Sequence, residues 1–269
     1  MKGITMSKFK LRFNMTAITL AVSSLFVTSL AAAEDIRVIS SGGFAQAYKN
    51  LASAYEKSSS DKLISGWGPS MGTTTNAIPV RMARGENIDV VIMVGDSLDT
   101  LMKEGKLVAG SKVVLANSLI ACAVKTGNAK PDISTVDGLK QAFLQARTVA
   151  YSDSASGEYI KHQLMKKLGI AEQMQGKAAQ IPATPVGEII AHGEADFGCQ
   201  QRSELLPVAG IDIVGLLPQE VQLSTPFSAA IVSGSKVQKN AQALLDFLSS
   251  EKNAGVIAET GLEPVAAKK

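Results

Sequence analysis

Apolar runs rich in β-branched residues alternate with amphipathic runs along this chain, and the alternation constrains the fold more than any other feature. The run Ile88–Val94 reads IDVVIMV, which is typical of a strand buried in a parallel sheet. After the strand-like run Ile36–Ser40, apolar residues recur at the helical period, at Phe44, Ala47, Leu51 and Ala54. No internal repeat interrupts the pattern. The sequence therefore predicts an α/β fold built from doubly wound lobes.

Two apolar segments indicate two lobes rather than one. Lys112–Lys125 (KVVLANSLIACAVK) is too long for one ordinary strand and suits a strand that runs between lobes. The return crossing is expected near Leu223–Val232. We expect lobe 1 to comprise residues 34–117 and 223–269, and lobe 2 to comprise residues 118–222. Ligands of such folds bind at the carboxyl ends of strands, against the N-termini of helices.

The first 33 residues have the pattern of a secretory signal peptide. Four basic residues (Lys2, Lys8, Lys10 and Arg12) precede the apolar run Met15–Leu30, and small residues follow up to Ala33. We expect cleavage after Ala33 and export to the periplasm. A retained membrane anchor is the weaker alternative, because the apolar run is short for a membrane span.

Removing this segment changes the charge balance. The chain has 27 Lys and Arg residues and 24 Asp and Glu residues. Four of the basic residues and none of the acidic ones lie in the signal, which leaves 23 against 24. A chain that is almost neutral gives no electrostatic support for a nucleic-acid partner, and we expect none.

The segment Gly66–Pro79 (GWGPSMGTTTNAIP) contains a Gly-x-Ser-x-Gly pattern around Ser70, which also occurs in the nucleophile turn of α/β-hydrolases. Such a serine needs a histidine base. The only histidines are His162, inside an expected helix, and His192, at an expected helix end before Gly193. Neither position suits a catalytic triad, and we do not expect Ser70 to be a nucleophile.

Three hydroxyl-rich turns instead indicate an anion site. Each is expected to follow a strand and to open a helix: Ser40-Ser41-Gly42-Gly43, Ser70-Met71-Gly72-Thr73-Thr74 and Ser154-Ala155-Ser156-Gly157. Helix capping would explain any one of them. Their recurrence in both expected lobes favours an oxyanion held by amides and hydroxyls, without formal positive charge.

Cys122 and Cys199 each lie in an apolar, strand-like run. In an oxidising compartment they can form a disulfide, whereas burial as two free thiols is equally compatible with the sequence. The two histidines have no spacing typical of metal ligands. We expect neither a metal nor a cofactor.

Three segments resemble the periplasmic molybdate-binding proteins of ABC transporters. They are ARGENIDVVIMV (Ala83–Val94), SASGEYIKHQLMKKLGI (Ser154–Ile170) and GEIIAHGEADFG (Gly187–Gly198). The resemblance implies the type II periplasmic binding protein fold, in which two lobes hinged by crossing strands hold an oxyanion between them. We expect a monomer, with a membrane permease as partner if the protein serves transport. By position, the ligand donors correspond to Ser41, the segment Ser70–Thr75, Ser156 and the neighbourhood of Val186.

The chain departs from that family where the family has a tyrosine, because Gln201 stands there, after Gln200 and before Arg202. Extra threonines also follow Ser70. More donors in a wider site suit carboxylates better than a compact tetrahedral oxyanion. The expected ligand contacts are Ser41, Ser70, Thr73, Thr74, Ser156, Gln200, Gln201 and Arg202.

These departures resemble those of an offshoot of the family, the periplasmic aconitate isomerases. The resemblance implies a reaction that shifts a double bond by moving an allylic proton between cis- and trans-aconitate, with one base and without a metal or nicotinamide. Glu158 and Glu204 are the candidate bases, and Tyr151 and Asp153 lie at the same expected edge. The alternative function is a transport protein that binds molybdate or an organic acid. In both cases the partner is a small anion.

Overall fold

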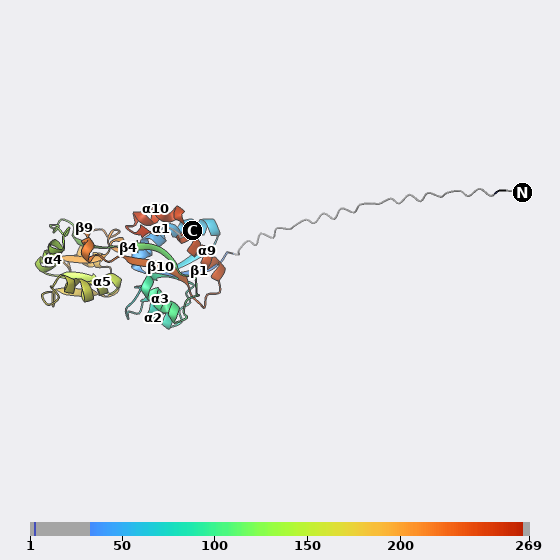
Figure 1. Ribbon diagram of the computed structural model, residues 1–269, viewed down its shortest axis with the longest axis horizontal. Coiled ribbons are helices and arrows are strands. Elements are labelled where there is room, and N and C mark those ends of the chain that lie inside the picture. Colours follow the sequence, from blue (N-terminus) through green and yellow to red (C-terminus); the bar gives the residue numbers. More distant parts are fainter. Residues whose placement is uncertain (1–2, 4–32, 266–269) are drawn as a thin grey trace. The chain divides into compact units, whose positions relative to one another are not determined.

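The structure of the protein is a computed structural model that describes Gly3 and residues 33–265 (Figure 1). The predicted signal peptide, residues 1–33, lies outside the described residues apart from Gly3 and Ala33, and it stays a prediction. In the part of the chain that is described, no helix is long and apolar enough to cross a membrane.

A six-stranded mixed sheet forms the first half of the fold, in the order β11-β4-β10-β3-β1-β2. Its strands are β1 (Asp35–Ser40), β2 (Lys62–Trp67), β3 (Val90–Val94), β4 (Val113–Ser118), β10 (Thr225–Ile231) and β11 (Glu263–Pro264). The strands β1, β2 and β3 are parallel, and β10 runs antiparallel between β3 and β4. The helices of this half are α1 (Gly42–Ser59), α2 (Ile78–Ala83), α3 (Gly95–Lys103), α9 (Gln238–Leu248) and α10 (Ala254–Glu259), with a 3-10 turn at Glu251–Asn253.

A five-stranded mixed sheet forms the second half, in the order β7-β6-β8-β5-β9. Its strands are β5 (Ile120–Lys125), β6 (Val149–Ser152), β7 (Ala178–Ile181), β8 (Phe197–Gln201) and β9 (Ile211–Leu216). Its helices are α4 (Val136–Gln145), α5 (Ala155–Tyr159), α6 (Met165–Lys167), α7 (Val186–His192) and α8 (Arg202–Leu205). A π-helical turn, Ile160–Leu164, joins α5 to α6, and a 3-10 turn spans Gln219–Val221.

Helices cover both faces of each sheet, because the buried strands are apolar on both faces. In β3, Val90, Ile92 and Val94 pack with α1 and α9, whereas Val91 and Met93 pack on the opposite face with α3. Figure 1 shows α1, α9 and α10 on one side of the first sheet and α2 and α3 on the other. The predicted α/β class is confirmed, although antiparallel strands make both sheets mixed.

The chain passes from the first sheet to the second at Leu119, which separates β4 from β5. It returns through residues 217–224 into β10, so the crossing expected within Lys112–Lys125 consists of two strands rather than one. The change of sheet supports the proposed lobe bounds, residues 34–117 with 223–269 and residues 118–222. These bounds stay a proposal, because the described residues 33–265 form one unit by their contacts.

A disulfide joins Cys122 of β5 to Cys199 of β8, which lie opposite each other in the antiparallel pair. Both residues are buried. The disulfide is therefore the outcome of the two alternatives that the sequence left open, and it fixes the strand that leads directly to Gln200 and Gln201.

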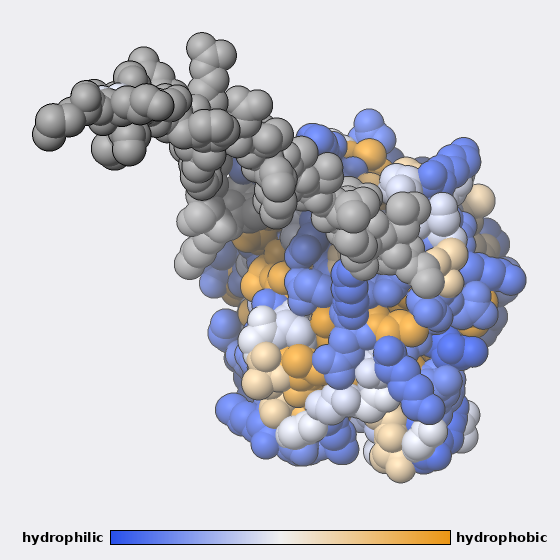
Figure 2. Space-filling view, turned by 90° about the vertical axis from the view of Figure 1, so that its right-hand side faces the viewer, coloured by the Kyte–Doolittle hydropathy of each residue, from blue (hydrophilic) through white to orange (hydrophobic). Residues whose placement is uncertain are grey.

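Apolar residues at the surface lie in separate areas between hydrophilic ones on the face that Figure 2 shows. The large exposed hydrophobic side chains among the described residues are Ile64, Trp67, Val114, Leu206 and Leu216. Scattered apolar residues of this kind are normal for a protein surface. Trp67 differs from the others because it also lines a cavity beside the candidate site.

Candidate functional site

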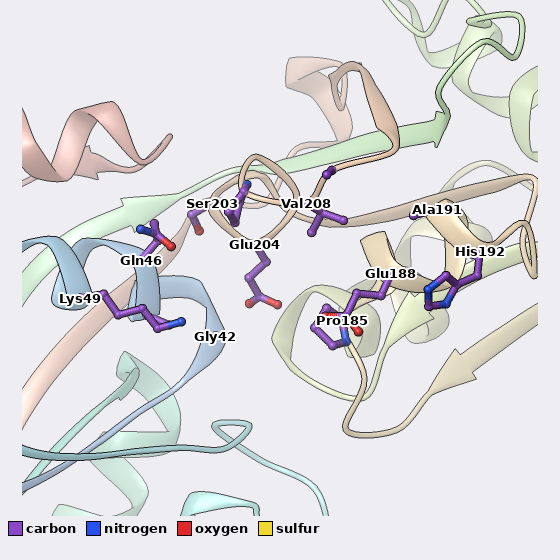
Figure 3. A pocket seen from close by; sticks show the side chains of 13 residues that line it. Gly42, Gln46, Lys49, Pro185, Glu188, Ala191, His192, Ser203, Glu204 and Val208 are labelled. Atoms are coloured by element: carbon purple, nitrogen blue, oxygen red, sulfur yellow. The ribbon is translucent and has the colours of Figure 1, made fainter.

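Two cavities meet at Glu204, and both are lined by residues from the two halves of the fold. The Lys49 cavity, of about 490 Å³, is shown in Figure 3. The second, the Asp153 cavity, has a volume of about 190 Å³. Gly42, Pro185 and Glu204 line both. The Lys49 cavity is otherwise lined by Ala45, Gln46, Lys49, Glu188, Ala191, His192, Ser203, Pro207, Val208 and Ala209. The Asp153 cavity is otherwise lined by Trp67, Gly68, Pro69, Asn76, Ser152, Asp153, Ser154, Ala183, Thr184 and Gln200.

Glu204 lies in α8 and directs its carboxyl at the first turn of α1. A Cβ atom on Gly42 would lie 2.9 Å from Glu204 Cδ, so the absence of a side chain at Gly42 makes room for the carboxyl. Gln200 Nε2 donates a hydrogen bond to Glu204 Oε2. A second contact between the halves lies next to it, where Ser203 Oγ donates to the Gly43 carbonyl at 2.7 Å. Glu204 is therefore held where the two halves touch.

Burial raises the pKa of the Glu204 carboxyl from 4.5 to about 7, and the negative charge of Asp153 acts in the same direction. Near neutral pH both protonation states are populated. This is the property that a group needs in order to take up a proton and return it.

Gln200 and Gln201 end β8, and both are buried. Gln200 Oε1 accepts a hydrogen bond from the Val186 amide at 2.9 Å, which orients its Nε2 toward Glu204. Gln201 Nε2 donates to Thr225 Oγ1 at 3.1 Å. Gln201 Oε1 is buried and has no partner among the described residues. Gln200 therefore positions the carboxyl, while Gln201 retains an unused polar atom.

Ser41 precedes α1 in the N-cap position, but its side chain makes no capping hydrogen bond. Its hydroxyl is buried and has no partner in the described part of the chain. A buried polar atom without a partner is costly, so Ser41 Oγ has the character of a ligand contact. Ser156, at the start of α5, is also buried, and its Oγ lies 3.2 Å from Ser152 Oγ.

The threonine-rich loop after β2 has mixed roles. Ser70 is buried, and its Oγ accepts a hydrogen bond from the Val94 amide at 3.0 Å, which is a structural contact. Thr74 Oγ1 is buried without a partner among the described residues, whereas Thr73 is exposed. Gly72, with φ +94°, approaches Asp153 from the other half. The loop thus contacts the second half of the fold, and Ser70 fixes the loop to the end of β3.

Among the predicted site residues, only Gln200 and Glu204 line the two cavities at Glu204. Arg202 is exposed and lines neither cavity, because its side chain runs past Gly261. Glu158 accepts a hydrogen bond from Gln180 Nε2 at 2.7 Å, and its other oxygen lies 3.2 Å from His162 Nε2. It lines a third cavity, of about 300 Å³. The two candidate bases therefore face different spaces.

Lys49 and Trp67 were not among the predicted site residues. Lys49 is the only lysine or arginine among the described residues that line the two cavities at Glu204. In the sequence, Lys49 could have been selected only by its position on the face of α1 opposite the core, two helical turns after Ser41.

Within the described residues, no group of three or more His, Cys, Asp or Glu residues comes together as metal ligands. The expectation of no metal and no cofactor stays a prediction.

Comparison with known proteins places this geometry in a family. Residues 36–263 match the bacterial extracellular solute-binding proteins. An aconitate isomerase from Pseudomonas sp is 46% identical over 255 residues, which cover 93% of this chain and 97% of that protein. The molybdate-binding protein ModA from Azotobacter vinelandii is 25% identical over 258 residues, which cover 93% and 98%.

The solved structure of the periplasmic molybdate-binding protein from Azotobacter vinelandii matches with a TM-score of 0.70 at 20% identity, over 87% of this chain and 100% of that one. The predicted resemblance and the type II binding-protein fold are confirmed. The chain belongs to the bacterial extracellular solute-binding protein family.

Proposed function

We propose that this protein is an aconitate isomerase of the periplasm, which interconverts cis- and trans-aconitate on a solute-binding fold. The similarity to the Pseudomonas enzyme supports the reaction. The observation in the structure that carries the proposal is Glu204, a half-buried carboxyl where the two halves meet, with its pKa raised to about 7. We assign Glu204 as the base in preference to Glu158, which faces another cavity.

The reaction needs one group that both removes and returns a proton. Ionised Glu204 takes a proton from the methylene carbon of aconitate, and the electron pair left behind forms a new double bond to the central carbon. The electron pair of the old double bond takes a proton from the Glu204 carboxyl at the former vinylic carbon. The protein ends as it began, and the double bond has moved by one position.

The carbanion-like intermediate is stabilised by donors that are already in place. The negative charge that leaves the methylene carbon spreads onto the neighbouring carboxylates of the substrate. The N-terminus of α1, an 18-residue helix, presents its first amides at Gly42, beside Glu204. Fixed dipoles of this kind stabilise developing charge without having to reorganise.

We place the ligand contacts at the polar groups that the fold leaves available. Ser41 Oγ, Thr74 Oγ1 and Gln201 Oε1 are buried without partners among the described residues. The two hydroxyls can donate hydrogen bonds to a carboxylate directly. Gln201 can donate there once its side-chain amide has rotated by half a turn, which exchanges the positions of Oε1 and Nε2. Ser156 adds a buried hydroxyl from lobe 2.

A periplasmic location is part of the proposal. It is supported by the signal-like residues 1–33 and by membership of an extracellular protein family. In this role the partner is a small tricarboxylate, and a permease is not needed.

Hydrogen exchange during turnover tests the proposal. Purified protein in deuterated water is mixed with trans-aconitate, and conversion is followed by ultraviolet absorbance and by NMR of the methylene signal. We expect cis-aconitate to form and deuterium to enter both isomers. The Glu204→Gln variant should bind trans-aconitate without converting it. Tight binding by the wild-type protein, with neither conversion nor exchange, would contradict the isomerase function.

The second candidate function is that of a transport protein that delivers molybdate or an organic acid to a membrane permease. The unpartnered hydroxyl of Ser41 favours it, because an oxyanion held by neutral donors needs such a group. Thermal-shift measurements with molybdate, sulfate, citrate and the aconitates separate the two. Strong stabilisation by molybdate without turnover of aconitate would select the transport function.

A further inference from the structure

Lys49 carries a charge that the fold does not neutralise. Its Nζ lies 4.7 Å from the centre of the Trp67 ring, and it takes part in no ion pair among the described residues. An ammonium over the face of an indole is attracted by the ring, which limits the positions that it can adopt. Lys49 is therefore a positioned cation without an anionic partner.

The aromatic ring beneath Lys49 is itself fixed. Trp67 packs edge-on against Tyr48, with the ring centres 5.9 Å apart. Tyr48 is buried in the core of the first half, and its hydroxyl lies 2.9 Å from Ser65 Oγ. The position of the Lys49 ammonium thus derives from the core of lobe 1 through two aromatic rings.

Lys49 and Glu204 face the same space. Figure 3 shows the Lys49 side chain extending from α1 toward the space into which the Glu204 carboxyl points from α8. Lys49 lies seven residues after Gly42, or about 10 Å along the helix axis. Helical side chains lean toward the N-terminus of their helix, which shortens the span to the carboxyl. A substrate at Glu204 can therefore reach Lys49 with a second charged group.

The charge balance of the site calls for such a cation. Aconitate has three carboxylates, and Glu204 adds a fourth negative charge when it acts as base. The cavity at Asp153 contributes a carboxylate and contains no lysine or arginine. Helix amides and hydroxyls supply only partial charges, so one full positive charge distinguishes a ligand with three carboxylates from one with two.

We propose that Lys49, held over Trp67, binds the substrate carboxylate remote from the methylene that reacts at Glu204, and that it makes the site select tricarboxylates over dicarboxylates. The identity of the substrate rests on the proposed function, whereas the role of Lys49 in binding does not require turnover.

Binding of three related acids to Lys49→Met tests the inference. Methionine keeps the length and packing of the side chain on Trp67 and removes the charge. The matched control is Lys57→Met, which removes the same charge from an exposed position in the last turn of α1. The probes are trans-aconitate, mesaconate and itaconate, and each of the two dicarboxylates lacks one of the three carboxylates. Dissociation constants are measured by calorimetry.

We expect Lys49→Met to weaken binding of trans-aconitate by about tenfold or more, as for the loss of a hydrogen bond between charged groups. Itaconate, which lacks the carboxylate remote from the methylene, should bind equally well to the wild-type protein and to this variant. Lys57→Met should change none of the three constants. If Lys49→Met leaves the affinity for trans-aconitate unchanged, or weakens all three acids equally, the inference is wrong.

Turnover of the same proteins separates this inference from the proposed function. Isomerisation of trans-aconitate by Lys49→Met with an unchanged dissociation constant would reject the role of Lys49 and retain the isomerase. Selective binding that depends on Lys49, without isomerisation by the wild-type protein, would reject the isomerase and retain the role of Lys49. Failure of the wild-type protein to bind trans-aconitate would reject both.

Discussion

Replacing Glu204 with glutamine removes the proposed base and keeps the shape of the side chain. The amide oxygen of glutamine can still accept the hydrogen bond from Gln200 Nε2, and the side chain still fits above Gly42. The variant therefore tests the carboxyl as a chemical group. It should fold, and it should bind trans-aconitate at least as well as the wild-type protein, because one negative charge near the ligand is gone.

The loss of activity should be large and should have a recognisable pH dependence in the wild-type protein. Removing a positioned general base typically lowers kcat by ~10²–10⁴-fold. Because burial raises the pKa of Glu204 to about 7, the wild-type rate should fall about tenfold per pH unit below pH 7 and level off above it.

The same pKa predicts the direction in which stability changes with pH. The folded protein holds the Glu204 proton up to about pH 7, whereas the unfolded chain loses it near pH 4.5. Between these values unfolding releases a proton, so the free energy of unfolding falls as pH rises. At 1.36 kcal/mol per pKa unit, the contribution of Glu204 falls by on the order of 3 kcal/mol.

Glu204→Gln has no carboxyl that titrates at this position. The free energy of unfolding of the variant should therefore rise progressively relative to that of the wild-type protein between pH 4.5 and pH 8. For a chain of this size, about 3 kcal/mol corresponds to a relative rise in Tm of roughly 6–12 °C. The assay is thermal unfolding of both proteins across this pH range, together with kcat for trans-aconitate. The matched control is Glu158→Gln, which changes a carboxyl in another cavity. The reasoning is refuted if Glu204→Gln retains wild-type turnover, or if Glu158→Gln abolishes it.

Four further variants or treatments test individual contacts. Gly42→Ala should lower kcat, because the new Cβ would lie 2.9 Å from Glu204 Cδ and displace the carboxyl. The Tm should not fall, because alanine favours a helix more than glycine does. An unchanged kcat would contradict the contact between Gly42 and Glu204. Ser41→Ala should raise the Kd for trans-aconitate about tenfold or more and leave urea unfolding unchanged, since its hydroxyl has no partner among the described residues. Ser70→Ala should instead lower the free energy of unfolding by about 1–3 kcal/mol, because the Val94 amide loses its acceptor. If the two serine variants changed the Kd and the free energy of unfolding equally, the distinct roles assigned to Ser41 and Ser70 would be wrong. Reducing the disulfide between β5 and β8 should lower the free energy of unfolding by about 2–5 kcal/mol in urea titrations with and without reductant.

Much of the fold follows from local patterns, and the exceptions have local reasons. The buried strand β3 and the amphipathic α1 were predicted, because their apolar residues follow the strand and helix periods. The edge strand β7 was not predicted, because it has only four residues and lies at the side of its sheet. The helix α4 was also left out, although Thr135 caps it by accepting a hydrogen bond from the Gly138 amide. That helix could have been predicted from its capping residue.

The candidate site was predictable only as far as it depends on neighbours in the sequence. Ser41 and Ser156 were selected because strand-to-helix turns rich in hydroxyls indicate anion donors, and both are buried at such turns. The choice between Glu158 and Glu204 depends on which carboxyl meets α1 of the other half. That contact joins Gly42 to Glu204 across the two sheets, and no local pattern encodes it.

Glu204 also bears on the choice between an enzyme and a binding protein. A carboxylate beside a site for anions repels its ligand when ionised, so a protein that only binds anions is weakened by it. With a pKa of about 7, Glu204 is partly neutral at the pH of binding, and the ligand can enter while the carboxyl holds its proton. Loss of that proton then supplies a base in contact with the bound acid. The carboxyl is thus a disadvantage for storage or delivery of an anion and a requirement for proton transfer, which is why its position favours the isomerase.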